Sequence, residues 1–241
     1  MGASVQLCSG LEEASRFAAG YTADLARQSI RERGVFYFAV SGGATPRRYF
    51  EALAARSGAE TIDWSKCHVF WADERFVAPD DAASNYRLVE EALLSRIEIP
   101  DANIHPVPTS APDPQAAAET YEATLRQVMG SGADFPSFDL IHLGMGADGH
   151  TASLFPDDPA LAEKKRWTTW VGTAGPGPLA PRIPRITLTL PVLSAARQAL
   201  FLVSGEYKIA LVERIVSGRE TAALPAALVD PKGGVVWVVA Q

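Results

Sequence analysis

Apolar residues follow two alternating patterns along this chain. In the first they recur every three or four positions, as Leu11, Ala14 and Phe17 do, and this spacing is typical of one face of an α-helix. In the second a few apolar residues stand side by side, which suits a short buried strand. The first pattern predicts helices over residues 11–26, 46–54, 86–93, 115–129 and 207–216. The second predicts strands over residues 35–40, 68–71, 138–143, 186–190, 200–203 and 235–240, with a strand-like patch around His105.

Expected strands and helices alternate from one end of the chain to the other. Such alternation favours parallel strands, because each helix returns the chain to the starting end of the sheet. We therefore predict an α/β fold with a Rossmann-like, doubly wound, mainly parallel sheet and helices on both faces. Residues 1–241 are expected to form one domain, within which the Gly- and Pro-rich stretch Gly172–Pro184 is a surface loop rather than a linker.

Charge and apolar run length argue against two classes of partner. The formal net charge is −6, whereas a nucleic-acid surface requires a basic patch, so we expect no nucleic acid. The apolar runs are strand-sized and far below the roughly 20 residues of a membrane span, so we expect no membrane contact. No secretory signal pattern begins the chain, and we expect a cytoplasmic protein. Cys8 and Cys67 match no metal or redox spacing and are expected to be reduced core thiols.

Polar, glycine-rich residues follow the first of these strands, at the place where open α/β sheets bind their ligands. The segment Ser41-Gly42-Gly43-Ala44-Thr45 lies between the strand at 35–40 and the helix expected to begin at Pro46. Its glycines let backbone N–H groups approach a ligand, its hydroxyls add donors, and the start of a helix favours an anion. The segment predicts a phosphate site, the alternative being a plain glycine turn before a helix.

A second polar segment, Asp73-Glu74-Arg75, follows the strand at 68–71. Adjacent opposite charges are commonly a solvated surface cluster, and by themselves they do not distinguish a site from such a cluster. Their position at the carboxyl end of a strand favours a functional role for Asp73 and Arg75.

A third segment, Gly144–Ser153, follows the strand at 138–143 and contains Asp148 and His150, which are close enough in the chain to face one cavity. It also matches the G-x-G-x-x-G pattern of dinucleotide sites. A dinucleotide fold, however, needs an acidic residue about 20 positions later at the end of the next strand, and Glu163 lies in a charged run instead. We therefore expect neither a nicotinamide nor a flavin cofactor.

His150 is the side chain best suited to act as a general base near neutral pH, and a carboxylate from Asp148 or Asp73 would fix its tautomer. No histidine pair has zinc-site spacing with a third ligand nearby, so we expect no metal. The chain also lacks the G-x-S-x-G turn of serine hydrolases and the P-loop of nucleotide phosphotransferases. The histidines expected to be structural, because they lie in or beside strands, are His68, His105 and His142.

Taken together and in this order, these segments resemble the 6-phosphogluconolactonase family, whose members open 6-phosphoglucono-1,5-lactone in the pentose phosphate pathway. The likeness spans nearly the whole chain, and its stretches are jointly more specific than any one of them. They are Ser41–Pro46, Trp71–Arg75 with Ser84 and Asn85 downstream, Gly144–Pro156, Pro184–Pro191 and Gly205–Lys208.

The resemblance implies that the ligand is a small phosphorylated sugar lactone. From the motifs above we expect no cofactor. The resemblance also implies charges from Arg185 and Lys208 at the phosphate. The phosphate site itself would be made by Ser41, Gly42, Gly43 and Thr45.

For the reaction, the resemblance implies that His150 deprotonates the water that attacks the lactone carbonyl, with Asp148 orienting His150 or its loop. Arg75 would position the substrate or stabilise the developing oxyanion, and Asp73 would hold Arg75 or the sugar hydroxyls. The N–H groups from Gly144 to Gly146 are further candidate donors to the oxyanion.

Two alternatives use the same fold. Glucosamine-6-phosphate deaminases carry a similar glycine, Asp and His segment, but theirs continues into an Asn-Glu-Pro run with a catalytic Glu, and Ser153–Pro156 offers no carboxylate here. The sugar-phosphate sensing domain of a transcription regulator would carry an attached helix-turn-helix, which this chain lacks. We expect the enzyme to be a monomer or a weak homo-oligomer.

Overall fold

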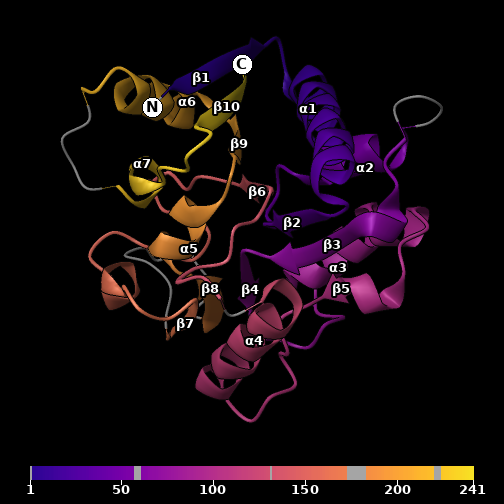
Figure 1. The fold of residues 1–241 in the computed structure, drawn as a ribbon. Coiled ribbons are helices and arrows are strands. Elements are labelled where there is room, and N and C mark those ends of the chain that lie inside the picture. Colours follow the sequence, from indigo (N-terminus) through magenta and orange to yellow (C-terminus); the bar gives the residue numbers. More distant parts are fainter. Residues whose placement is uncertain (1, 57–60, 131, 173–182, 220–223) are drawn as a thin grey trace.

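A large parallel sheet and a small antiparallel sheet form the framework of the protein (Figure 1). The computed structural model describes residues 2–56, 61–130, 132–172, 183–219 and 224–241. The α-helices are α1 Leu11–Arg33, α2 Arg47–Ala54, α3 Asn85–Ala92, α4 Pro114–Met129, α5 Leu190–Ala195, α6 Glu206–Val216 and α7 Pro225–Leu228. The strands are β1 Ala3–Cys8, β2 Phe36–Val40, β3 Cys67–Trp71, β4 Asp73–Arg75, β5 Ile104–His105, β6 Leu140–Leu143, β7 Thr168–Val171, β8 Arg185–Leu188, β9 Ala199–Ser204 and β10 Val235–Ala240.

The large sheet has the strand order β1-β10-β9-β6-β2-β3-β5, and every neighbouring pair in it is parallel. Strands β6 and β10 are buried at every position because both of their faces are covered. Helix α1 lies across the sheet and against α2, and its small side chains allow close contact. Its buried alanines are Ala14, Ala18, Ala19, Ala23 and Ala26. A mainly parallel sheet with helices around it confirms the predicted fold class.

Strand order reverses between β2 and β6, which are neighbours in the middle of the large sheet. From β2 the chain moves outward to β3 and β5, whereas β6 lies on the other side of β2 and is followed outward by β9 and β10. Loops that leave two such strands diverge and open a crevice at their carboxyl ends. The two glycine-rich segments predicted to bind ligand, Ser41–Thr45 and Gly144–Ser153, follow these two strands.

The small sheet has the order β4-β8-β7 and is antiparallel throughout. Ala72 joins it to the large sheet, because its N–H donates to Val40 O at 2.8 Å and its carbonyl accepts from Leu188 N at 2.8 Å. The prediction that residues 186–190 continue the parallel alternation was wrong, since this strand pairs in the antiparallel sheet and ends before α5. All four residues of β8 are buried, and continuous burial does not distinguish the two kinds of sheet.

Three strands were not predicted at all, and one of them is β4, whose residues Asp73–Arg75 are all charged. β1 is an edge strand with only Cys8 fully buried, and β7 mixes buried with exposed positions, so neither presents an apolar run. The prediction for the two cysteines is confirmed, because Cys8 and Cys67 are both free and buried. No helix in the described ranges has the length and apolar character needed to cross a membrane. Most of Gly172–Pro184 (residues 173–182) lies outside the described residues, and the single domain stays a prediction.

Candidate active site

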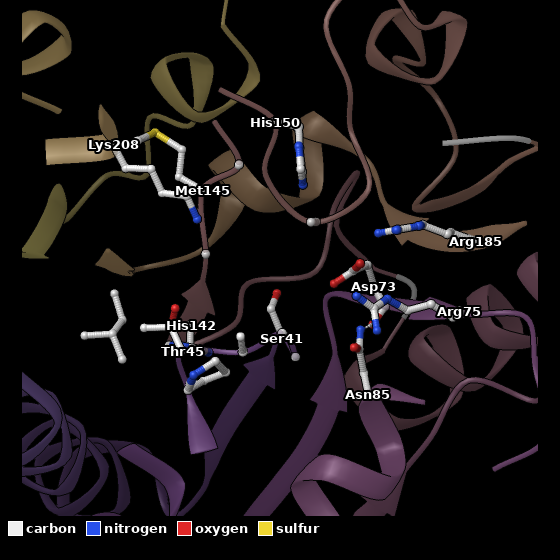
Figure 2. Close-up of a pocket in the computed structure, with 18 residues that line it drawn as sticks. Ser41, Thr45, Asp73, Arg75, Asn85, His142, Met145, His150, Arg185 and Lys208 are labelled. Atoms are coloured by element: carbon white, nitrogen blue, oxygen red, sulfur yellow. Dashed lines mark hydrogen bonds between the residues drawn. The ribbon is translucent and has the colours of Figure 1, made fainter. Parts of the chain in front are cut away.

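A cavity of about 210 Å³ opens where β2 and β6 end (Figure 2). Of the residues predicted to form the site, only Asp148 does not line it, and Asp148 is hydrogen-bonded to His150, which does. The predicted residues that line it are Ser41, Gly42, Gly43, Thr45, Asp73, Arg75, Gly144, Gly146, His150, Arg185 and Lys208. Residues from five separate segments of the chain thus meet in one place.

The loop between β2 and α2 forms one wall of the cavity. Gly43 has a φ of 110°, a left-handed conformation that disfavours any other residue. The Ser41 side chain is 4% exposed and its hydroxyl has no hydrogen-bond partner, while the Thr45 hydroxyl lies 3.4 Å from that of Ser204. In the view of Figure 2, Ser41 and Thr45 lie on the side of the cavity opposite His150, and Lys208 extends into it from α6. A buried hydroxyl without a partner is costly unless a ligand or water satisfies it, so this wall is suited to a polar ligand.

His150 and Asp148 form a close pair in the loop after β6. Asp148 Oδ1 lies 2.5 Å from His150 Nδ1 and also accepts from the His150 backbone N–H at 3.1 Å. A carboxylate only accepts, so Nδ1 carries the hydrogen and Nε2 is left with its lone pair. Burial acts to raise the pKa of Asp148, but the hydrogen bonds and charge of His150 outweigh it and hold that pKa below its ordinary value. Figure 2 shows the His150 ring pointing into the cavity. Asp148 and Asp73 were both expected as carboxylates that could fix the tautomer of His150, and Asp148 is the one that contacts the ring.

Gly146 has a different role from the one expected. Its N–H donates to His150 O at 2.9 Å and closes the turn, so the expectation that it donates to an oxyanion was wrong. A Cβ at this position would lie 2.1 Å from His150 Nδ1 and 2.6 Å from Asp148 Oδ1. The absence of a side chain therefore lets the His150–Asp148 pair form. Gly144 lines the cavity, and its carbonyl accepts from Thr151 Oγ1 at 2.9 Å.

Two arginines lie side by side on the small sheet, because Arg75 and Arg185 are direct partners in the β4–β8 register. Like charges directly opposite each other are unfavourable in a sheet, and the guanidinium Nε atoms of both are buried without a partner. Burial lowers the pKa of Arg185, an effect that Arg75 reinforces and the charge of Asp73 opposes. Such a pair is suited to receive an anionic or strongly polar oxygen of a ligand.

Asp73 is buried beside these arginines without forming the expected ion pair with Arg75. Its Oδ2 accepts from Ser153 Oγ at 2.7 Å, and Arg75 Nη1 instead donates to the carbonyl of Ala83 at 2.6 Å. The alternative in which Asp73 holds Arg75 was therefore wrong, because the Arg75 side chain is drawn toward the loop before α3. The alternative in which Asp73 contacts sugar hydroxyls stays a prediction.

Glu74 points away from the cavity and caps α3. Its carboxylate accepts backbone N–H groups from Arg75 at 2.7 Å, Asn85 at 2.8 Å and Tyr86 at 2.7 Å. Burial raises the pKa of Glu74 to about 7, although the hydrogen bonds from these three N–H groups act to lower it. This carboxylate fastens β4 to the first turn of α3 and so fixes the wall that carries Asp73 and Arg75.

The remaining histidines are buried or partly buried. His68 Nδ1 lies 2.9 Å from His105 Nε2, and both rings stack in parallel away from the cavity. His142 is 1% exposed, stacks on Tyr49 at 4.8 Å between ring centroids, and borders the cavity with neither ring nitrogen hydrogen-bonded. Within the described parts of the chain, no three His, Cys, Asp or Glu side chains come together as a metal site would require.

Sequence reasoning missed several residues of the cavity wall. Asn85 was recognised only as part of a motif before a helix, although it is 2% exposed and lines the cavity. The apolar positions carried no chemical signal, because their place in the wall depends on how distant segments pack. The other missed lining residues are Ala44, Pro46, His142, Met145, Ala152 and Leu202.

Comparison with known proteins agrees with this arrangement. The family described as glucosamine-6-phosphate isomerases/6-phosphogluconolactonase matches residues 10–237. A 6-phosphogluconolactonase from Synechocystis sp. is 44% identical over 218 residues, which cover 89% of this chain and 85% of that protein. The crystal structure of a 6-phosphogluconolactonase from Thermotoga maritima matches with a TM-score of 0.85 and 32% identity, covering 99% of this chain and 100% of the other.

A monomeric glucosamine-6-phosphate deaminase shares the fold, with a TM-score of 0.79 at 21% identity, over 98% of this chain and 96% of that one. At this identity the likeness shows a shared fold. The match to the family over most of the chain and the identity to its lactonase members lead to one conclusion. The chain belongs to the glucosamine-6-phosphate isomerase/6-phosphogluconolactonase family.

Proposed function

We propose that this protein hydrolyses 6-phospho-D-glucono-1,5-lactone to 6-phospho-D-gluconate, the step of the oxidative pentose phosphate pathway that 6-phosphogluconolactonases perform. The observation that carries the proposal is the His150–Asp148 pair, 2.5 Å apart, with the free ring nitrogen facing a cavity that also contains Lys208 and Arg185. A base and cations in one cavity are suited to an anionic substrate with a carbonyl that water can attack.

In this mechanism His150 Nε2 takes a proton from a water molecule as the water oxygen bonds to the lactone carbonyl carbon. Asp148 stabilises the imidazolium that forms, as a carboxylate behind a histidine does in other hydrolases. The tetrahedral intermediate then breaks its bond to the ring oxygen. The protonated His150 returns the proton to that oxygen, which becomes a hydroxyl of the open-chain product. One C–O bond forms, one breaks, and the base is regenerated.

The negative charge on the carbonyl oxygen needs a donor during this reaction. Arg75 is our candidate, because it lines the cavity with a buried, unpartnered Nε. Asp73, which accepts a hydrogen bond from Ser153, is our candidate acceptor for a sugar hydroxyl. Met145 and Gly144 at the end of β6 are further candidates through their backbone N–H groups, now that Gly146 is committed to the turn.

The phosphate of the substrate is proposed to bind the β2–α2 loop, where Ser41, Gly42, Gly43 and Thr45 present hydroxyl and backbone donors. Cations from two other elements complete the site, Lys208 from α6 and Arg185 from β8. Backbone and hydroxyl donors fixed by the fold, together with positively charged side chains, are the usual chemistry of phosphate recognition.

The competing activity within the family is deamination of glucosamine 6-phosphate. The position at which deaminases carry a Glu falls in a segment without a carboxylate here, and the Ser153 hydroxyl is already used by Asp73. The two activities are separated by incubating the protein with freshly generated 6-phosphogluconolactone and, separately, with glucosamine 6-phosphate. We expect hydrolysis above the spontaneous rate with the first and no ammonia release with the second. The reverse result would replace the lactonase proposal by the deaminase.

A further inference from the structure

Asn85 lies between the two walls of the cavity and touches both. It is the first residue of α3 and is 2% exposed. Its Nδ2 donates to the backbone carbonyl of Asp73 at 2.8 Å, and its own N–H donates to Glu74 Oε1 at 2.8 Å. A carbonyl oxygen only accepts, so the amide NH2 group must face Asp73 and Oδ1 must face the opposite way. That way lies Gly42 of the β2–α2 loop.

The contact with Gly42 is unusually close. A Cβ on Gly42 would lie 2.1 Å from Asn85 Oδ1, 2.5 Å from its Cγ and 2.9 Å from its Cβ. Gly42 is not among the residues with positive φ, so its backbone conformation is open to other residues and only space forbids them. Its neighbour Gly43 is the converse case, with a φ of 110° and nothing within 4 Å of an added Cβ.

We propose that Asn85 is a positioning residue that braces the β2–α2 loop against β4 and so sets the distance between the phosphate donors and the reacting groups. The inference rests on the proposed function, because it takes the ligand of the loop to be the substrate phosphate. Asn85 Oδ1 is buried against Gly42 and makes no hydrogen bond to the loop, so the contact between Asn85 and the loop is one of packing. When the substrate is bound by its phosphate, this distance determines where its carbonyl carbon lies relative to His150. A small displacement of that carbon would lower the reaction rate strongly.

Substitution of Gly42 and Asn85, singly and together, tests the brace. Gly42→Ala should weaken binding of 6-phosphogluconate and of inorganic phosphate by at least about tenfold, because the new methyl collides with Asn85 and displaces the loop. Asn85→Ala alone should weaken it roughly tenfold, through loss of the buried bond to Asp73. In the double variant the contacts with Oδ1 and Cγ are removed and only the 2.9 Å contact with the Cβ of residue 85 remains. Binding should therefore recover most of the way to the level of Asn85→Ala instead of falling by the product of the two effects.

Two control variants test whether the loss of binding in Gly42→Ala comes from the steric collision with Asn85. Asn85→Asp keeps the volume of the side chain and should not rescue Gly42→Ala. Gly43→Ala is impaired by its backbone conformation, so Asn85→Ala should not rescue it either. A second readout separates positioning from general destabilisation. Asn85→Ala should lower kcat/KM roughly tenfold more for the phosphorylated lactone than for unphosphorylated gluconolactone, whereas a loss of folded protein would lower both equally.

Binding is measured by calorimetry and folding by thermal unfolding of each variant. If Gly42→Ala does not fold, recovery of its Tm in the double variant supports the brace, and failure to recover contradicts it. The proposal is overturned if the two effects multiply, if Gly42→Ala binds as the wild type does, or if the wild type binds neither phosphate probe. A wild type that binds phosphate and shows the rescue but does not hydrolyse the lactone would retain the brace and refute the proposed function.

Discussion

Replacing Asp148 tests how the carboxylate supports His150. Asp148 Oδ1 accepts from both the His150 backbone N–H and Nδ1. In Asp148→Asn the backbone N–H, which only donates, keeps the amide oxygen in this position, and that oxygen can still accept from Nδ1. The loop and the tautomer of His150 are then expected to survive, and what is lost is the negative charge behind the imidazolium.

The expected size of this loss follows from the difference between hydrogen bonds to charged and to neutral acceptors. That difference is about 1–2 kcal/mol, which corresponds to roughly a 5- to 30-fold fall in kcat. Asp148→Ala also removes the acceptor and frees the ring to turn, and it should cost about 100-fold or more.

The assay is stopped-flow hydrolysis of fresh 6-phosphogluconolactone with a pH indicator, with the spontaneous rate subtracted at every pH. Thermal unfolding of both variants checks that the fold is retained. Near-native kcat in Asp148→Asn would show that the charge is not used. A loss in Asp148→Asn as large as in Asp148→Ala would show that the amide does not keep the ring in place, and would refute the reasoning from the shared oxygen.

Three further predictions follow from other contacts. Lys208→Ala should lower kcat/KM for the phosphorylated lactone on the order of 100-fold, and native enzyme should be poor on unphosphorylated gluconolactone to a similar degree. Equal efficiency on both lactones would contradict the phosphate site. Gly146→Ala should fold yet lose roughly 100-fold in kcat, since its methyl would occupy the place of His150 Nδ1, 2.1 Å away. Burial, with His68 adding to it, lowers the pKa of His105 to about 4, and burial lowers that of His142 to about 3. Glu74 opposes these two groups, because its pKa is raised to about 7 and the folded chain binds its proton more strongly. Two histidines outweigh one carboxyl group, so the unfolded chain binds more protons below about pH 6.5. The urea midpoint should therefore fall as pH is lowered from about 6.5 toward 4, with a shallower slope in His142→Leu.

Much of the site could be predicted from the sequence because it depends on strand ends. Parallel strands bring their carboxyl ends to one edge, so the segments at Ser41, Asp73 and His150 meet once the strands are recognised. The pairing of His150 with Asp148 is local, within one glycine-rich turn. Apart from the edge strand β1, the strands of the large sheet were predicted from their short apolar runs.

Features that depend on packing between distant segments could not be predicted in this way. A fully buried strand such as Arg185–Leu188 has the same apolar pattern in a parallel and in an antiparallel sheet, so the small sheet was missed. The contact between Asn85 and Gly42 joins two segments that share no pattern. Gly146 was taken for an oxyanion donor because a glycine in a sequence can mean either an accessible N–H group or a need for space. The structure shows that Gly146 provides space for the His150 side chain.

The most direct test of the mechanism is the rate of lactone hydrolysis by wild type and His150→Ala across pH, in buffer with EDTA and with the spontaneous rate subtracted. We expect activity in the wild type that chelation leaves unchanged and that falls on the acid side as the imidazole is protonated. His150→Ala should fold and bind 6-phosphogluconate, yet lose roughly 100- to 10,000-fold in kcat together with that acid limb. Near-native hydrolysis by His150→Ala, or loss of wild-type activity on chelation, would contradict the assignment of His150 as the base.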